Sequence, residues 1–188
     1  MKVINSYPQP RDAAMILGIP ADVFLQFHVA VSLIAIASGL VVLYGLVAAK
    51  PLAGWTVLFL ATTILTGVTG FPLAPFGLDP PRVVGIFLLA LMAAAVVGLY
   101  VFGLAGAWRW IYVVTAVMSL YLNCFVGVIQ AFQKLAFLHA LAPTQSEPPF
   151  LIAQVAVLVV FVVLGVIAVV RPRAHADSAA KEIPWRAG

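Results

Sequence analysis

Five long apolar stretches, separated by short polar or proline-containing segments, dominate the chain. They cover residues 23–49, 55–71, 83–105, 111–129 and 150–170. Each approaches or exceeds the roughly 20 apolar residues that a helix needs to cross the ~30 Å hydrocarbon core of a bilayer. The runs are continuous and lack the alternation of a membrane β-barrel, and lipid offers no partner for open backbone groups. The pattern therefore predicts an all-α, polytopic transmembrane helical bundle with five membrane-spanning helices.

Prolines and helix-start residues mark the boundaries between these stretches. Lys50 and Pro51 end the first stretch and predict a tight return into the second. Asp79 precedes two prolines, a pattern typical of a capping residue followed by the first turn of a helix. Ser146 or Glu147 stands in the same relation to the prolines that open the last stretch. These boundaries support five helices joined by short connections.

The composition agrees with a chain that lies mostly in lipid. Hydrophobic residues make up 64% of the 188 residues and charged residues only 9%, with a mean hydropathy of +1.15. Too little polar surface remains to keep a domain of this size in water. The first apolar stretch is also longer than the ~7 to 15 residues of a signal-peptide core. We expect an extramembrane segment at 1–20, one transmembrane domain at 21–171 and a basic cytoplasmic tail at 172–188.

Five spans place the two termini on opposite sides of the membrane. The positive charges divide four against six, and the larger number lies on the side of the carboxyl terminus. The positive-inside rule then favours an outside amino terminus and a cytoplasmic carboxyl terminus. A basic tail near anionic lipid accounts for the net charge of +4, and nucleic-acid binding is not expected. The four are Lys2, Arg11, Arg82 and Lys134, and the six are Lys50, Arg109, Arg171, Arg173, Lys181 and Arg186.

Polar side chains inside the stretches are costly in lipid, so their positions are the best functional evidence in the sequence. His28, Ser32, Ala35 and Gly39 share one small and polar helix face, suited to packing against a neighbour. Antiparallel connectivity brings further polar residues to a similar depth, toward the side where the first helix begins. The resulting ligand-binding candidates are His28, Thr66, Thr69, Asn123, Gln130, Lys134 and Gln154.

Each candidate also has a structural interpretation. Threonines in membrane helices usually donate to their own helix or to a neighbour, and such contacts contribute well under ~1 kcal/mol. Asn123 and Gln130 would then link helices, and Lys134 would extend its stem to the interface. The third stretch and the rest of the fifth are nearly free of polar residues. We expect these two helices to face lipid or a partner subunit.

His28 is the most informative single residue, because an intramembrane histidine can bind a metal or haem, carry a proton or make a structural hydrogen bond. Haem would need a second axial ligand, for which His139 in the last loop is the candidate. These two histidines are also the only metal-ligand candidates. The sequence has no Cys-x-x-Cys, His-Glu-x-x-His, phosphate-binding glycine loop or Gly-x-Ser-x-Gly motif. No catalytic residues are therefore assigned, and enzyme activity is not the leading hypothesis.

Several segments resemble a family of uncharacterised small bacterial polytopic membrane proteins. They are Leu-Gln-Phe-His at 25–28, residues 58–70, Gly-Ala-Trp-Arg-Trp-Ile-Tyr at 106–112, and residues 141–150 with Ala-Pro-Thr-Gln-Ser-Glu-Pro-Pro. The resemblance spans most of the chain between Leu25 and Gln154. It implies a bacterial, inner-membrane location and carries no activity with it.

Three functional hypotheses follow. The first is a polar intramembrane pocket near the outer face that binds a small amphipathic ligand, such as a quinone or a lipid head group. The alternative is a non-catalytic accessory subunit of a larger membrane complex, or a homo-oligomer, in which the polar residues only hold the bundle together. The third is a small transporter or channel. It ranks last, because the polar groups fade toward the cytoplasmic side.

Overall fold

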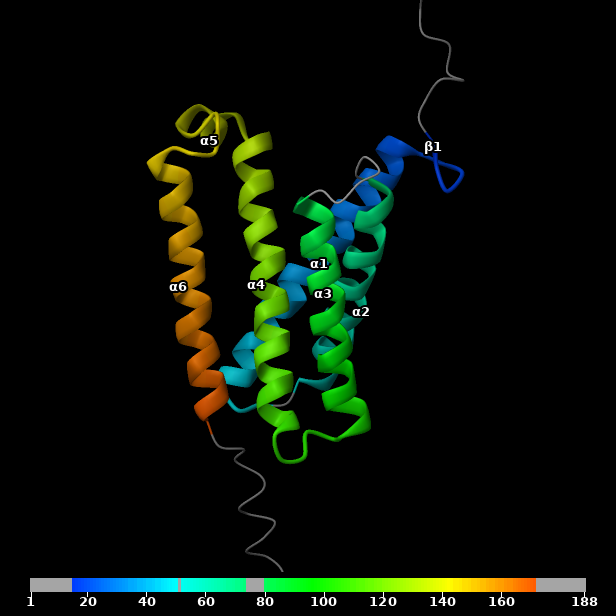
Figure 1. Ribbon diagram of the computed structural model, residues 1–188, viewed down its shortest axis with the longest axis vertical. Helices are drawn as coiled ribbons and strands as arrows, with labels where there is room; N and C mark the ends of the chain where they lie inside the picture. The colour runs from blue at the N-terminus through cyan, green and yellow to red at the C-terminus, as the bar shows by residue number, and fades with distance from the viewer. Residues whose placement is uncertain (1–14, 51, 74–79, 172–188) are drawn as a thin grey trace, which may run out of the picture.

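A computed structural model describes residues 15–50, 52–73 and 80–171. Within them the chain forms five helices that are long and apolar enough to cross a membrane, and they lie side by side as an all-α bundle (Figure 1). The predicted fold class is therefore confirmed. The five helices are α1 (Ala21–Val47), α2 (Ala53–Gly70), α3 (Pro80–Val96), α4 (Trp108–Lys134) and α6 (Pro148–Val170).

The bundle has two ends. We call the end where α1, α3 and α6 begin and α2 and α4 finish the N-side, at the top of Figure 1. The opposite end, where α1 and α6 finish and α2 and α4 begin, is the C-side. Neighbouring helices along the chain run in opposite directions, so residues far apart in the sequence meet at each end.

Short elements complete the fold, and the hydrophobic pattern did not predict them. Strands β1 (Met15–Ile16) and β2 (Ile19–Pro20) form an antiparallel pair before α1. The 3-10 helix η2 (Phe71–Leu73) follows α2, the π-helix η3 (Val97–Val101) extends α3, and α5 (Ala136–Leu141) crosses the N-side between α4 and α6. Each is too short for a periodic pattern to reveal it.

The predicted helix starts have different outcomes. Asp79 lies outside the described residues, whereas Glu147 directly precedes α6 as its N-cap residue. The carboxylate of Glu147 turns back to its own loop and accepts hydrogen bonds from the Thr144 and Ser146 backbone N–H groups, each 3.1 Å, and from the Thr144 hydroxyl at 2.9 Å. Desolvation alone would raise the pKa of Glu147, but these hydrogen bonds outweigh it and hold the pKa below its usual value.

Among the described glycines, Gly39 of α1 has the tightest surroundings. A Cβ atom added there would lie 2.5 Å from Cδ1 of Leu120 on α4 and 2.8 Å from Cε2 of Phe59 on α2. Only a residue without a side chain fits such a site, and small residues at helix crossings are typical of membrane bundles. Gly39 therefore lets the side chains of Phe59 and Leu120 pack against the backbone of α1. α1 packs more extensively on α2 than on any other helix.

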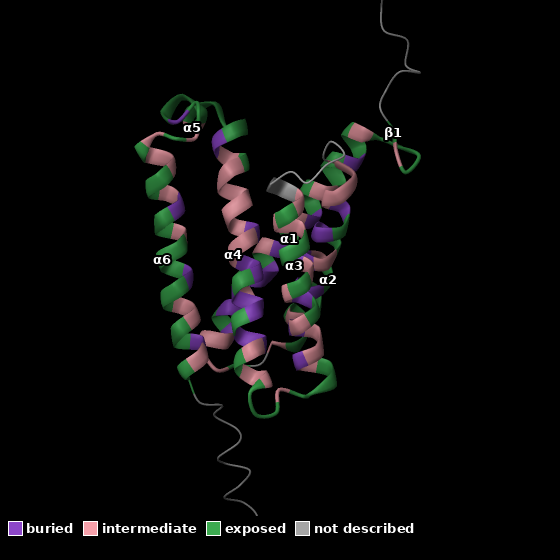
Figure 2. Cartoon of the chain, viewed as in Figure 1, coloured by how far each residue is buried: buried purple, intermediate pink, exposed green. Residues whose placement is uncertain are grey.

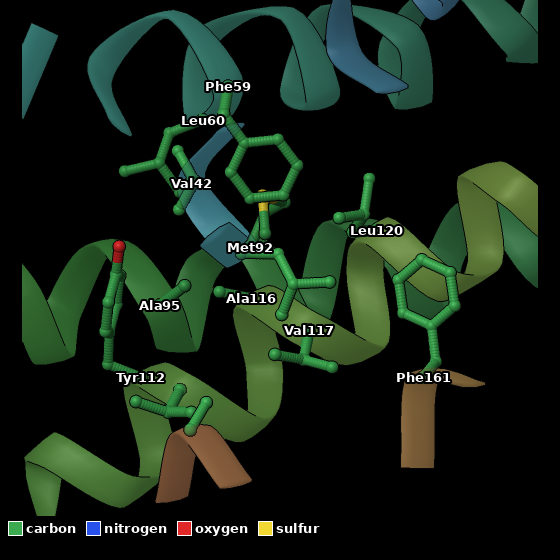
Figure 3. Packing of buried hydrophobic residues seen from close by; sticks show 13 residues of the cluster. Val42, Phe59, Leu60, Met92, Ala95, Tyr112, Ala116, Val117, Leu120 and Phe161 are labelled. Atoms are coloured by element: carbon green, nitrogen blue, oxygen red, sulfur yellow. The ribbon is translucent and has the colours of Figure 1, made fainter. Parts of the chain in front are cut away.

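The apolar core extends from this crossing toward the C-side. Figure 3 shows Phe59 and Leu60 of α2 and Met92 of α3 close to Leu120 and Ala116 of α4. On α4 the buried residues run from Tyr112 to Asn123, with Phe132 as the one buried residue beyond them. Figure 2 accordingly shows buried positions in the lower part of α4 and intermediate positions above. The buried positions of α4 are therefore concentrated in its C-side half.

The outer helices are as sparsely buried as the sequence predicts. In the most apolar window of α6 only 11% of residues are buried inside the structure, and in that of α3 22%, against 44% in α4. α6 nevertheless packs closely on α4 at Gly165, where an added Cβ would lie 3.3 Å from Cγ1 of Val117. Most of the surface of these two helices is therefore left uncovered by the rest of the described chain, and the expectation that they face lipid or a partner subunit stays a prediction.

Replacing Gly39 with alanine is expected to destabilise the protein by about 1–3 kcal/mol, the usual effect of overpacking a filled interior. Gly54→Ala is the matched control, since an added Cβ at Gly54 meets nothing within 4 Å. Equilibrium unfolding in mixed detergent and dodecyl sulfate micelles would measure both variants. Equal stability of the two variants would show that the site at Gly39 has room for a Cβ atom.

Candidate functional site

At the N-side, the predicted candidates His28 and Thr69 are joined by a hydrogen bond between α1 and α2. His28 Nδ1 lies 2.8 Å from the Thr69 hydroxyl, and that hydroxyl donates to the Leu65 carbonyl oxygen at 2.7 Å. Because the hydroxyl proton is used toward Leu65, Nδ1 of His28 is the donor to Thr69. Nε2 of the neutral ring then carries the lone pair, and it is the ring atom left to accept a further hydrogen bond.

Three other candidates are buried polar residues on different helices. Thr66 on α2, Asn123 on α4 and Gln154 on α6 are each more than nine-tenths buried. Gln154 Nε2 donates to the Phe125 carbonyl oxygen at 3.2 Å, which links α6 to α4. The glutamine therefore has the interhelical role that its residue type suggests in a membrane. Its Oε1 atom and the polar atoms Thr66 Oγ1 and Asn123 Nδ2 have no hydrogen-bond partner among the described residues.

The remaining N-side candidates lie on the surface. Gln130 and Lys134 are exposed in the last turns of α4, and His139 is exposed on α5. No hydrogen bond joins His28 to His139 in the described part of the chain, and that part holds no group of three or more His, Cys, Asp or Glu side chains suited to a metal ion. The structure thus joins His28 and Thr69 by a hydrogen bond, and Lys134 is near enough to His28 for its charge to act on the imidazole. No hydrogen bond in the described part of the chain joins either residue to Gln130, Lys134 or His139.

A cavity of about 450 Å³ lies at the C-side. All five long helices or the turns next to them contribute to its wall, which is mainly aliphatic. None of the sequence-predicted candidates lines it. We call it the basic cavity, because three cations and no carboxylate are among its lining residues. Its polar side chains are Lys50, Thr56, Tyr100, Arg109, Tyr112 and Arg171.

The turn between α1 and α2 places Lys50 at this cavity. Ala49 has a left-handed backbone with φ 56°, and the Lys50 N–H group donates to the Gly45 carbonyl oxygen at 2.8 Å. This bond, together with one from Ala49 N–H to the Leu46 carbonyl oxygen, forms a Schellman motif, in which glycine is the usual left-handed residue. The chain reverses there within a few residues, so Lys50 stays beside the end of α1.

Two arginines bind the C-side ends of three helices together. Arg109, in the first turn of α4, donates from Nη2 to the carbonyl oxygen of Arg171, which follows α6. Arg171 in turn donates from Nη1 to the carbonyl oxygen of Val47 at the end of α1. Cations at helix carboxyl ends satisfy free carbonyl groups and the negative end of the helix dipole. A guanidinium group has five N–H donors, so each arginine keeps donors for an anion.

A second cavity of about 310 Å³ lies in the seam between α4 and α6 and is almost wholly apolar. Val117, Phe161 and Gly165 are among its lining residues. Like the basic cavity, it includes none of the predicted ligand-binding residues. It offers an acyl chain van der Waals contact but no polar recognition.

Sequence reasoning missed the basic cavity because each of its cations has an ordinary explanation. Lys50, Arg109 and Arg171 flank apolar stretches, where positive residues commonly mark the cytoplasmic interface. Their separation in sequence hides the fact that they line one cavity. The available signal was topological, since all three fall on the same side once five alternating spans are assumed.

Comparisons of the chain with protein-family models, with curated proteins and with solved structures find no match.

A double-mutant cycle would measure the bond between His28 and Thr69. His28→Leu and Thr69→Val are expected to couple by about 0.6 kcal/mol, the average for interhelical hydrogen bonds in a membrane protein. His28→Leu combined with Thr62→Val is the control, because the Thr62 hydroxyl donates to Leu58 of its own helix at 2.7 Å. Unfolding in mixed micelles gives the free energies, and equal coupling in both cycles would contradict the assignment.

Proposed function

We propose that this chain is a bacterial inner-membrane protein that binds an anionic amphiphile in the basic cavity. The observation that carries the proposal is the convergence of Lys50, Arg109 and Arg171 on a largely aliphatic cavity of about 450 Å³. That volume lies within the roughly 300–1,000 Å³ typical of small-molecule sites. An anionic head group would lie against the cations while its hydrocarbon part lies against the aliphatic wall.

The chemistry of the wall favours a lipid head group over a quinone. Guanidinium groups bind phosphate and carboxylate oxygens in paired hydrogen bonds, and a neutral quinone ring makes no use of three positive charges. Basic pockets between membrane helices on the cytoplasmic side are suited to anionic lipid head groups. Tyr100 and Tyr112 add hydroxyl groups to a wall that includes Val42, Leu46 and Val113. No reaction is assigned to the site.

The proposed orientation places the basic cavity in the cytoplasmic leaflet. Within the described residues the C-side has three cations and no carboxylate, whereas Asp22 and Glu147 both lie at the N-side. The positive-inside rule favours the cytoplasm for the end with more lysine and arginine. Trp55 and Trp110 are about half exposed near the same end, as expected of residues at a membrane interface.

A reporter fused to the carboxyl terminus tests this orientation. A fluorescent protein that matures only in the cytoplasm is expected to fluoresce, and a periplasmic phosphatase fused at the same point is expected to be inactive. The opposite pair of signals would place the basic cavity in the outer leaflet.

Removing the Lys50 charge is expected to weaken binding of an anionic lipid. Each lysine or arginine near an anionic head group contributes about 1 kcal/mol, so Lys50→Gln should lower the affinity for phosphatidylglycerol about fivefold. Lys50→Arg should restore it. Native mass spectrometry of the protein in neutral detergent, titrated with phosphatidylglycerol or phosphatidylcholine, gives both affinities.

Lys134→Gln is the matched control, because it removes one exposed positive charge at the opposite end of the bundle. It should leave the affinity for phosphatidylglycerol unchanged. Equal binding of the two lipids by the unaltered protein, or an equal loss in both variants, would contradict the proposal. Arg109 and Arg171 are less suited to this test, because both also join helix ends.

A further inference from the structure

Four buried polar atoms in the membrane-spanning helices lack a hydrogen-bond partner among the described residues. They belong to side chains that are each more than nine-tenths buried. Most serines and threonines described here donate to their own helix, as Thr115 does to the Ile111 carbonyl oxygen at 2.8 Å. The unpartnered atoms are therefore exceptions within this bundle. They are Thr63 Oγ1, Thr66 Oγ1, Asn123 Nδ2 and Gln154 Oε1.

Three of these atoms lie just to the N-side of the helix crossing at Gly39. Phe59 of α2 and Leu120 of α4 meet at Gly39, and both of these helices run toward the N-side. Thr63 is one turn beyond Phe59, and Asn123 is nearly one turn beyond Leu120, so both are about 5 Å along from the crossing. Thr66 follows in the next turn of α2. We call Thr63, Thr66 and Asn123 the polar layer.

The polar layer coincides with the edge of the apolar core. Asn123 is the last buried position on α4 before Phe132, and residues 124–129 are only partly buried. Ile36 of α1 packs against this partly buried part of α4, where its Cδ1 atom would lie 3.5 Å from a Cβ added at Gly127. The polar layer thus has Gly39, Phe59 and Leu120 on its C-side and adjoins the less buried half of α4 on its N-side.

Leaving these atoms without partners would be costly. A buried donor or acceptor without a partner costs about 1–3 kcal/mol, and bulk water does not reach the interior of a bilayer. The amide of Asn123 offers N–H donors, whereas the hydroxyls of Thr63 and Thr66 can donate or accept. The missing partner must therefore accept a hydrogen bond from nitrogen and exchange hydrogen bonds with hydroxyl groups.

We propose that the polar layer is a binding site for a neutral oxygen atom, supplied by bound water or by the hydroxyl head of a lipid-soluble molecule. An oxygen atom with a proton and two lone pairs can accept a hydrogen bond from the Asn123 amide, and it can donate to or accept from the hydroxyl of Thr63 or Thr66. A buried water typically makes about three hydrogen bonds to polar groups that would otherwise lack a partner. The site lies apart from the basic cavity and shares no residue with it.

Replacing Thr66 with valine tests the proposal, because valine keeps the shape and removes the hydroxyl. With a bound oxygen, Thr66→Val loses a real hydrogen bond and should lower the melting temperature by about 3 °C. Thr115→Val is the matched control: Thr115 is 8% exposed and Thr66 is 9% exposed, and the Thr115 hydroxyl bonds only within its own helix. Thr66→Val should therefore melt below Thr115→Val.

The opposite order would overturn the proposal. If no oxygen atom is bound, Thr66→Val removes only an unpartnered hydroxyl. It then melts at the same temperature as Thr115→Val or above it. The source of the oxygen is then read from the same preparations. A stoichiometric hydroxylated lipid, extracted from the unaltered protein and depleted in Thr66→Val, identifies a head group. If no such lipid is extracted, radiolytic hydroxyl labelling near Asn123 decides. Labelling that is weaker in Thr66→Val than in the unaltered protein identifies water.

Discussion

The close approach of three helices at Gly39 is the contact on which the rest of the bundle depends. Lipid tails are as apolar as leucine, so helices in a membrane associate through van der Waals packing and not through exclusion of water. Gly39 permits this packing by letting Phe59 and Leu120 reach the backbone of α1. From this point the core fills toward the C-side, while the polar layer lies toward the N-side. A single position without a side chain therefore separates two regions of different chemistry.

The C-side combines stability with recognition in the same residues. Arg109 and Arg171 connect the ends of α1, α4 and α6 through backbone carbonyl groups, yet both also line the basic cavity. Each arginine thus has its stem and some of its donors fixed before any anion arrives. A site that is ordered in advance spends less free energy on immobilising side chains when it binds. The helix contacts and the proposed lipid site are consequently parts of one arrangement.

The sequence predicts the membrane spans well, because the length of an apolar run has a direct physical meaning in a bilayer. It also predicts the small, polar face of α1, since Gly39 packs on α2 and His28 reaches Thr69. The β1–β2 pair and α5 escape prediction, because elements of two to six residues carry no periodic signal. The basic cavity escapes for another reason. Its cations lie far apart along the chain, and only the packing of helix ends brings them together.

An odd number of spans gives the bundle an electrical polarity. Three helices finish at the C-side and two begin there, so the helix macrodipoles leave a net of about half a negative charge at that end. Lys50, Arg109 and Arg171 exceed this charge and make the C-side positive. An energised membrane is negative on its cytoplasmic face. It therefore favours placing the positive C-side at that face, by about 2.3 kcal/mol per elementary charge for each 100 mV. The proposed orientation is therefore also the one in which the membrane voltage holds the chain in place.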